Sequence, residues 1–380
     1  MVLIKLKVKY SYNKYYKQDS IYCNMNNMNN MKGIDILKQI LLTKTHKNVA
    51  SYINVAVGTV KRWEELNNIP DLYRFELMKM AGAEIDYSVY SFKEKDQFFT
   101  PSETAEYCYQ KSNEIIGKCG DDVTNYTYVE PSAGNGNFLK VLPLNRRIGM
   151  DIEPRDNEVF KQDFLDWDDL AGQGGDNKYI VIGNPPFGLR GHLALKFINH
   201  SASFADYVCF ILPQLFESDG KGVPRKRVVG FNLIHSEKIK TDFASPDGKS
   251  IKVECIFQVW SKHHTNDEYN IKKIDTSVIK IYSLSDGGTP STTRNKKMFD
   301  KCDVYIPSTC FGKNNMRFHN TFNELPRRKG YGIVFNKNKR ANIKKFKTID
   351  WSSVAFLSTN SAYNIRTSQI ASMFSYTKNN

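Results

Sequence analysis

The sequence lacks paired cysteines, long apolar runs and a lysine-bearing phosphate loop. Its seven cysteines are odd in number and include no C-x-x-C pair, which argues against a disulfide framework and a tetrathiolate zinc site. We therefore expect no bound metal, and reduced thiols in an intracellular protein. No apolar run approaches the roughly 18 residues of a membrane span, and the start of the chain lacks the apolar segment of a secretory signal. We expect no membrane association.

Acidic residues are in deficit, because 54 lysines and arginines face 40 aspartates and glutamates, a net charge of +14. The excess is uneven: +6 for residues 1–95, −7 for 96–215 and +15 for 216–380. Basic flanks attract polyanions such as nucleic acid, although an ordinary solvated surface is the alternative. We expect a small-molecule site in the acidic centre and nucleic-acid contacts on the flanks.

The most informative segment is Asn184-Pro185-Pro186-Phe187, which follows a buried strand predicted over 179–182. Two prolines fix φ and remove two N–H donors, so the Asn184 side-chain oxygen and the Pro185 carbonyl remain as acceptors. Such acceptors suit an exocyclic aromatic amine, because hydrogen bonds from its N–H groups favour a nitrogen that can attack a methyl donor. Phe187 is then suited to stack on the ring. A Pro-Pro turn with an aromatic plug is the structural alternative.

A second motif joins a strand to a glycine-rich turn. The strand predicted over 126–130 ends in Glu130, and Gly134 and Gly136 follow, where the backbone can approach a ligand closely. The turn has neither a P-loop lysine nor the full G-x-G-x-x-G pattern, so it is not expected to cradle phosphate. Asp151 ends another strand 21 residues after Glu130, where doubly wound sheets commonly bind ribose hydroxyls.

Further segments complete the predicted catalytic domain at 96–264. Asp163 and Phe164 form a polar-aromatic pair suited to an adenine ring, and Thr100 precedes a helix predicted over 104–116. A buried strand over 207–213 leads to Phe216, and a strand over 251–260 is expected at an antiparallel edge. Strands with polar ends that alternate with helices predict an α/β class, a Rossmann-like sheet with helices on both faces.

The amino-terminal flank divides into a low-complexity tail (1–30) and a helical module with a linker (31–95). The segment 48–63 resembles a helix-turn-helix with a turn near Asn54 and a second helix that presents Thr59, Lys61 and Arg62. Pro70 is expected to end this unit, and 81–95 to form a helix fragment and linker. A packing or dimerisation module is the alternative.

The carboxyl-terminal flank is basic. The loop 219–227 carries Arg225, Lys226 and Arg227 and is expected to become ordered on DNA. Residues 265–380 interleave cations, among them Arg327 and Arg328, with aromatic side chains. We interpret them as an α+β target-recognition region, with basic loops on an ordinary core as the alternative.

In this order, the motifs of residues 96–216 resemble the S-adenosylmethionine-dependent amino-methyltransferases of the DNA N6-adenine type. The resemblance implies a Rossmann-like methyltransferase fold, catalysis by Asn184 to Phe187, and stacking of the target base on Phe187 and Phe216. It also implies S-adenosylmethionine as cofactor, bound by Thr100, Pro101, Glu130, Ala133, Gly134, Gly136, Asp151, Ile152, Asp163, Phe164 and Asn184. Glu130 departs from the family pattern, where aspartate is commoner.

The predicted activity is therefore methylation of adenine N6 in double-stranded DNA, with the base extruded from the duplex. A second subunit or a companion restriction nuclease is a further expected partner. Methylation of RNA adenine, of a protein glutamine amide, or a DNA-binding regulator with a non-catalytic methyltransferase fold are the alternatives. The basic carboxyl-terminal third argues against a protein substrate, and cytosine N4 is less favoured because those loops more often begin with serine.

Overall fold

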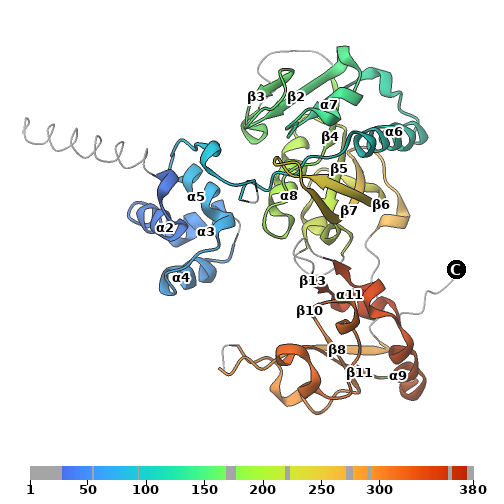
Figure 1. Cartoon of the computed structure of the whole chain (residues 1–380). Helices are drawn as coiled ribbons and strands as arrows, with labels where there is room; N and C mark the ends of the chain where they lie inside the picture. The colour runs from blue at the N-terminus through green and yellow to red at the C-terminus, as the bar shows by residue number, and fades with distance from the viewer. Residues whose placement is uncertain are drawn as a thin grey trace, which may run out of the picture. The chain divides into compact units, whose positions relative to one another are not determined.

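The computed structural model describes residues 28–53, 55–92, 94–167, 177–218, 223–270, 277–289, 292–357 and 362–374. The chain divides into two compact units, Met1–Gln97 and Phe98–Asn380 (Figure 1). Most of the tail predicted over 1–30, the predicted turn residue Asn54, and residues 219–222 of the basic loop lie outside the described residues.

Four α-helices and their shared apolar core make up most of the described part of the first unit. Leu37, Val49, Val60 and Leu77 are fully buried in this core. The helices are α2 (Gly33–Leu41), α3 (His46–Tyr52), α4 (Val57–Glu65) and α5 (Arg74–Met80).

Two predictions for this unit are wrong. Pro70 does not end it, because α5 follows and packs into the same core. Proline ends one helix yet is well suited to begin the next turn, where its missing N–H costs nothing, and a 3-10 turn starts at Asp71. The described part of 81–95 holds only a 3-10 turn at Tyr87–Val89 in place of the predicted helix fragment.

A seven-stranded sheet organises the second unit, in the order β3-β2-β1-β4-β5-β7-β6. The first five strands in this order pair in parallel, and β7 is antiparallel to both β5 and β6. The strands are β1 (Tyr126–Glu130), β2 (Arg147–Asp151), β3 (Val159–Lys161), β4 (Lys178–Gly183), β5 (Tyr207–Pro213), β6 (Asn232–Ala244) and β7 (Ser250–Ser261).

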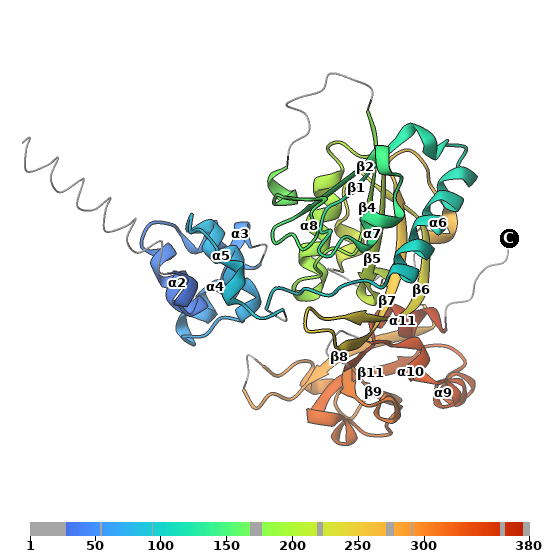
Figure 2. The ribbon, with the colours of Figure 1, turned by 45° about the horizontal axis from the view of Figure 1, so that its top comes forward.

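Helices cover both faces of this sheet (Figure 2). On one face, α6 (Ser102–Lys118) and α7 (Asn137–Val141) bury Cys108 and Phe138 against the strands. On the other, α8 (His192–Ser201) buries Phe197 and Ile198. The Rossmann-like α/β class predicted from the sequence is confirmed.

The strand predicted over 251–260 at the antiparallel edge of the sheet is instead the second strand from that edge. The structure assigns 250–261 to β7, and the edge strand is β6, which the sequence did not reveal. Its sequence mixes charged and apolar residues, and its burial follows no strict alternation, partly because the pairing shifts register between Leu233 and His235.

The carboxyl-terminal region holds two three-stranded sheets, in the orders β10-β13-β12 and β8-β11-β9. Phe346 and Trp351 are central to its core, where their ring centroids lie 4.4 Å apart. Its elements are β8 (Ile279–Ser285), β9 (Val304–Pro307), β10 (Thr309–Phe311), β11 (Lys329–Phe335), α9 (Lys339–Thr348), α10 (Trp351–Val354), β12 (Phe356–Leu357), β13 (Ala362–Asn364) and α11 (Thr367–Ser372).

Candidate active site

The candidate site lies where the strand order reverses, between β1 and β4. The chain runs from β1 outward to β2 and β3, then returns to β4 on the other side of β1. Open α/β sheets bind ligands at this switch point, outside the carboxyl ends of the strands. Glu130 is the last residue of β1, and Asn184 directly follows β4. The fold therefore brings the two predicted motifs together.

Gly183 lets the two motifs approach each other. A Cβ added there would lie 3.3 Å from the Glu130 Cγ, tighter than most contacts in proteins. The Ser132 hydroxyl, just beyond β1, donates to the Asn184 carbonyl over 3.1 Å. Ser132 thus ties the glycine-rich turn to the Asn-Pro-Pro-Phe segment, a link that no motif indicated.

Two buried oxygens in this site have no hydrogen-bond partner in the structure: Asn184 Oδ1 and Glu130 Oε2. The Asn184 amide nitrogen makes one long contact, 3.4 Å to the Phe98 carbonyl. Buried polar atoms are nearly always paired, so two orphaned acceptors on neighbouring strands point to a ligand that brings N–H or O–H donors.

The glycine-rich turn wraps around the end of β2. Gly134 N donates to Asp151 Oδ2 over 2.8 Å, and Ala133 N donates to the Met150 carbonyl over 2.9 Å. Gly134 and Gly136 have left-handed backbones, with φ of 49° and 76°. Ala133 is buried. The turn is therefore held by Asp151 as well as by its own glycines.

Burial dominates the electrostatics of the two strand-end carboxyls. Desolvation raises the pKa of Glu130 well above its usual range, and the nearby Asp151 raises it further. Desolvation also raises the pKa of Asp151, although N–H groups of Glu153 and Gly134 oppose the shift. Two carboxyls in this state favour a ligand that offers a cation or hydroxyl donors.

The other predicted cofactor residues are buried or half-buried. Thr100 is buried, and its carbonyl accepts a 2.8 Å hydrogen bond from the Asn137 side chain at the start of α7. Pro101 and Ile152 are half-buried. Asp163 is also half-buried, and its carboxylate accepts from Leu165 N over 3.0 Å.

Phe99 and Arg155 also belong to this site, although no motif indicated them. A Cβ on Gly134 would lie 3.0 Å from the Phe99 ring, so this ring covers the glycine turn. Arg155 N donates to the Gly134 carbonyl over 3.0 Å, and its guanidinium lies 5.7 Å from the centre of the Phe99 ring. The aromatic pair Phe98-Phe99 before Thr100 was the only sequence signal that a ring packs over the glycine turn.

The segment Asn184–Phe187 is fixed at its far end by α8. The Phe187 carbonyl accepts from Leu193 N over 3.1 Å and from Ala194 N over 3.3 Å. Pro185 is buried, whereas Pro186 and Phe187 are half-buried. The backbone of this segment is therefore held by the first turn of a helix, which limits its freedom to reorient.

The three predicted stacking rings do not lie together. Phe187 packs against the core on the α6 and α7 side of the sheet, whereas Phe164 and Phe216 lie in the core on the α8 side. Phe216 is 0% exposed and Phe164 1% exposed, so neither presents a ring face to a ligand as it stands. Phe164 packs edge-on against His200 at 4.9 Å. Their stacking roles stay predictions, and Phe187 is the accessible ring.

The helix α4 carries the candidate contacts of the first unit. Val60 is its one buried side chain; Thr59 is half-buried, and Lys61 and Arg62 are exposed. The stretch 28–92 has eight basic and seven acidic residues, so it is nearly neutral. Any phosphate contact here depends on these local cations, and a helix-turn-helix role stays a prediction.

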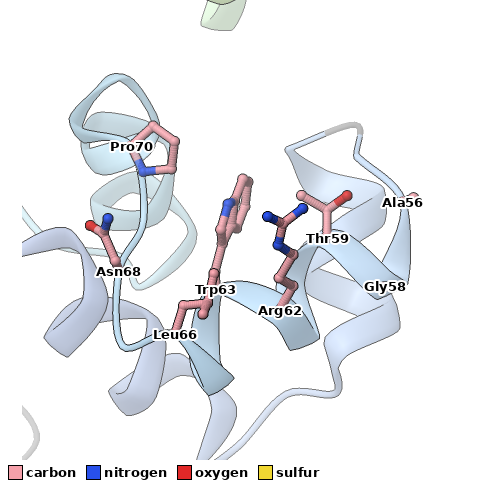
Figure 3. A pocket seen from close by; sticks show the side chains of 8 residues that line it. All are labelled: Ala56, Gly58, Thr59, Arg62, Trp63, Leu66, Asn68 and Pro70. Carbon is pink, nitrogen blue, oxygen red and sulfur yellow. The ribbon is translucent and has the colours of Figure 1, made fainter. Parts of the chain in front are cut away.

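An open hollow of about 460 Å³ lies beside α4. Figure 3 shows the Arg62 guanidinium and the Trp63 indole side by side in it. The Trp63 ring also contacts Tyr73, with centroids 4.8 Å apart. The hollow is lined by Ala56, Gly58, Thr59, Arg62, Trp63, Leu66, Asn68 and Pro70.

The predicted cations of the carboxyl-terminal flank differ in their surroundings. Arg225 donates to the Tyr269 carbonyl and so has a structural partner, whereas Lys226 is exposed and Arg227 half-buried. Arg328 pairs with Asp286 over 2.7 Å. Arg327 is exposed and makes no ion pair or hydrogen bond with the described residues.

No cluster of three or more histidine, cysteine, aspartate or glutamate side chains is placed to hold a metal within the described parts of the chain. No helix in those parts is long and apolar enough to cross a membrane.

No protein-family model and no curated protein matches the chain. Among solved structures, PH1948 from Pyrococcus horikoshii, provisionally named an RNA methyltransferase, is 19% identical with a TM-score of 0.31, covering 44% of this chain and 86% of its own. The type IIG restriction endonuclease BpuSI is 12% identical with a TM-score of 0.33, covering 73% and 36%. The magnesium protoporphyrin IX methyltransferase ChlM from Synechocystis PCC 6803, solved with bound S-adenosylmethionine, is 13% identical with a TM-score of 0.26, covering 57% and 97%. Similarity at this level transfers no substrate or reaction.

Proposed function

We propose that this protein transfers a methyl group from S-adenosylmethionine to the N6 amino group of adenine in DNA. The observation that carries the proposal is the buried, unpartnered Asn184 Oδ1 at the switch point of the sheet, one strand from the unpartnered Glu130 Oε2. An acceptor in this position has no structural role, and it is what an exocyclic amine requires.

The residues around the glycine turn fit S-adenosylmethionine. This cofactor brings an amino group and ribose hydroxyls, which can donate hydrogen bonds to the carboxyl groups of Glu130 and Asp151. Gly134 and Gly136 leave the turn without side chains that would hold a ligand away from the backbone. The half-buried Asp163 and Ile152 are the parts of their motifs open to an adenine ring, with Thr100 and Pro101 across the turn.

When bound, the cofactor supplies a methyl group already activated on a sulfonium, so the chain's own task is to position the acceptor nitrogen. Asn184 Oδ1 and the Pro185 carbonyl accept from the two N–H groups of the amine, which withdraws its lone pair from the ring. Phe187 stacks on the base and fixes its plane. The tie of its carbonyl to α8 keeps this segment in place without rearrangement.

DNA is the proposed substrate because the basic flanks suit a polyanion. The carboxyl-terminal third carries +15, and α9 alone holds five lysines and arginines with no acidic residue. Because N6 is paired inside the duplex, the base has to be extruded to reach the switch point. We assign target recognition to the region 265–380, with Arg327 and Arg328 among its contacts, and an accessory DNA contact to Thr59, Lys61 and Arg62 of α4. A companion nuclease or subunit is compatible with this role.

The test is methyl transfer from labelled S-adenosylmethionine to duplex DNA, single-stranded DNA and RNA in parallel, with the modified nucleoside identified after digestion. We expect N6-methyladenine in duplex DNA. Label confined to RNA would overturn the substrate and keep the chemistry. Cofactor binding without transfer to any of the three would overturn the reaction.

A further inference from the structure

Three of the seven described non-glycine residues with left-handed backbones are arginines. Arg190, Arg327 and Arg328 have φ of 55°, 55° and 47°. Asparagine and aspartate tolerate this conformation, but a long side chain does so at a cost that the surrounding structure has to offset. The other four positive-φ residues of the described chain are all of the tolerant kind: Asn67, Asp96, Asn295 and Asn338.

Arg190 lies three residues beyond Phe187, on a short excursion of the backbone (residues 188–192). Both ends of this excursion are fixed. Leu193 N and Ala194 N both donate to the Phe187 carbonyl, which closes the excursion at its base. A Cβ on Gly188 would lie 2.7 Å from Leu193 Cβ, and one on Gly191 2.8 Å from the Phe216 ring. The two glycines are thus pressed against the core.

Arg190 itself is turned outward. It is exposed, and its guanidinium makes no ion pair or hydrogen bond with any residue that the structure describes. Arg328, in contrast, has the Asp286 carboxylate as a partner that accounts for its position. Within the described parts of the chain, this strained cation beside the catalytic segment has no partner that would explain its position, and such strain persists mainly at functional sites.

A second cationic segment approaches the same excursion. Pro224, which begins the 3-10 turn Pro224–Arg227, lies 3.3 Å from the position of a Gly191 Cβ. The Asn199 side chain of α8 donates to the Arg227 carbonyl over 3.1 Å and accepts from Val229 N over 2.9 Å, which fixes this turn on α8. The exposed Lys226 lies within this turn. Two segments more than 30 residues apart in the sequence, one with Arg190 and one with Lys226, thus carry cations on either side of the contact between Gly191 and Pro224, which we call the cationic rim.

The negative charge of the region around the site calls for cations, such as those of this cationic rim, where a nucleic acid would enter. The stretch 96–215 is net −7, and Glu130 and Asp151 lie at its centre. A nucleic acid entering this acidic region is repelled unless cations at the entrance neutralise its phosphates. Arginine suits this because its planar guanidinium binds two phosphate oxygens at once.

We infer that Arg190 binds the phosphodiester next to the extruded base, with Lys226 and Arg227 extending the contact along the same strand. The inference rests on the proposed function, because it needs a polynucleotide base in the Asn184 site. It adds a phosphate-binding residue that no motif indicates, held in place by the same excursion that ends the catalytic segment.

The test uses three variants of the whole chain. Arg190→Asn removes the charge and keeps a residue that tolerates the left-handed backbone; Arg190→Gly removes charge and strain; Arg190→Lys keeps the charge without the planar fork. Lys118→Asn is the control, since its side chain is an exposed cation at the end of α6, paired with Glu114. DNA affinity is measured across salt concentrations by fluorescence anisotropy, beside the KM for duplex DNA, the cofactor Kd and the Tm.

We expect Arg190→Asn and Arg190→Gly to raise the KM for DNA about tenfold. We also expect them to make the plot of log affinity against log salt less steep, with the magnitude of its slope reduced by about one. Their cofactor Kd is unchanged, and Arg190→Gly melts no lower than the wild type. Arg190→Lys keeps the salt slope and loses part of the affinity. Lys118→Asn changes none of these values.

The outcomes separate this inference from the proposed function. If the wild type methylates adenine and Arg190→Asn keeps its salt slope and KM, the phosphate contact is wrong and the reaction stands. If the wild type binds DNA without methylating it and Arg190→Asn lowers the slope, the contact stands and the reaction is wrong. A lower Tm for Arg190→Gly with an unchanged slope would make Arg190 a structural residue, and a wild type that binds no DNA would overturn both.

Discussion

At the scale of single residues, the site is marked by what its polar atoms lack. Nine buried side-chain atoms in the described parts of the chain lack a hydrogen-bond partner, and Asn184 Oδ1 and Glu130 Oε2 are among them. Each such atom lowers the free energy of unfolding by about 1–3 kcal/mol relative to a satisfied one. A protein tolerates this where a ligand recovers the loss, so the two atoms define where function and stability compete.

The first prediction concerns Asn184. Asn184→Ala removes the side-chain acceptor for the amine, so we expect methyl transfer to fall by about 100-fold or more, in line with the loss of one preorganised polar group in other enzymes. Cofactor affinity stays within a few-fold, which equilibrium binding of labelled S-adenosylmethionine measures. Ser132→Ala is the matched control: it loses only the hydrogen bond to the Asn184 carbonyl and retains most activity. Wild-type turnover in Asn184→Ala would remove Asn184 from catalysis.

The second prediction uses the raised pKa of Glu130. An acid whose pKa is higher in the folded than in the unfolded protein destabilises the fold once pH exceeds its unfolded value of about 4.5, because the unfolded chain then ionises freely whereas the buried carboxyl of the folded state does not. Glu130→Gln removes that ionisation. We expect a higher Tm than the wild type at pH 7, a difference that disappears below about pH 4.5, and weaker cofactor binding.

Thermal melts of both proteins from pH 4 to pH 8 measure this. A Glu130→Gln variant that melts lower than the wild type at neutral pH would show that the carboxylate is already satisfied in the free protein.

At the scale of elements, a glycine of β11 shows how closely the backbones of two paired strands pack. A Cβ on Gly330 of β11 would lie 2.3 Å from the Ile306 carbonyl oxygen of the paired strand β9, a backbone atom with little freedom to move. We expect Gly330→Ala to lower the free energy of unfolding by about 1–3 kcal/mol. Gly117→Ala in α6 is the control, because nothing lies within 4 Å of its added Cβ and alanine favours the helix by about 0.5–1 kcal/mol.

Chemical denaturation of the two variants decides this prediction. Opposite signs are expected, and a Gly330→Ala protein as stable as the wild type would mean that β9 and β11 separate easily.

Elements whose sequence carries its own pattern were predictable. The apolar run of β5 was placed at 207–213 and lies at Tyr207–Pro213, because a buried parallel strand needs unbroken apolar residues on both faces. The edge strand β6 alternates poorly and was missed, since its form depends on pairing with β7 more than on its own residues. Pro70 was misread because α5, which continues the unit, is recognisable only from its packing against the shared core.

At the scale of the whole molecule, the two units have separate cores. The apolar cluster of the first unit contains only residues up to Tyr90 among its buried members, and the clusters of the second unit start at Ala105. We expect two thermal transitions. Leu37→Ala, at a fully buried site of the first unit, costs about 2–5 kcal/mol and lowers only the transition of that unit.

Differential scanning calorimetry with and without S-adenosylmethionine assigns the transitions, because a ligand stabilises only the unit that binds it. S-adenosylmethionine is expected to raise the midpoint temperature of the transition that Leu37→Ala leaves unchanged. A single transition moved by both would show that the units unfold together.

The sequence by itself determined the chemistry that this protein has available. The order of the Glu130 turn, Asp151 and the Asn184 segment, each placed after an apolar run, predicted a nucleoside-binding α/β sheet, because hydrophobic period and strand-end polarity are local properties of the chain. The tertiary structure decided which of those residues meet. It brought Glu130 beside Gly183, buried Phe164 and Phe216 among rings from distant elements, and left Arg190 exposed three residues beyond Phe187. Burial and pairing depend on residues far apart in the chain, so no local pattern could have fixed them.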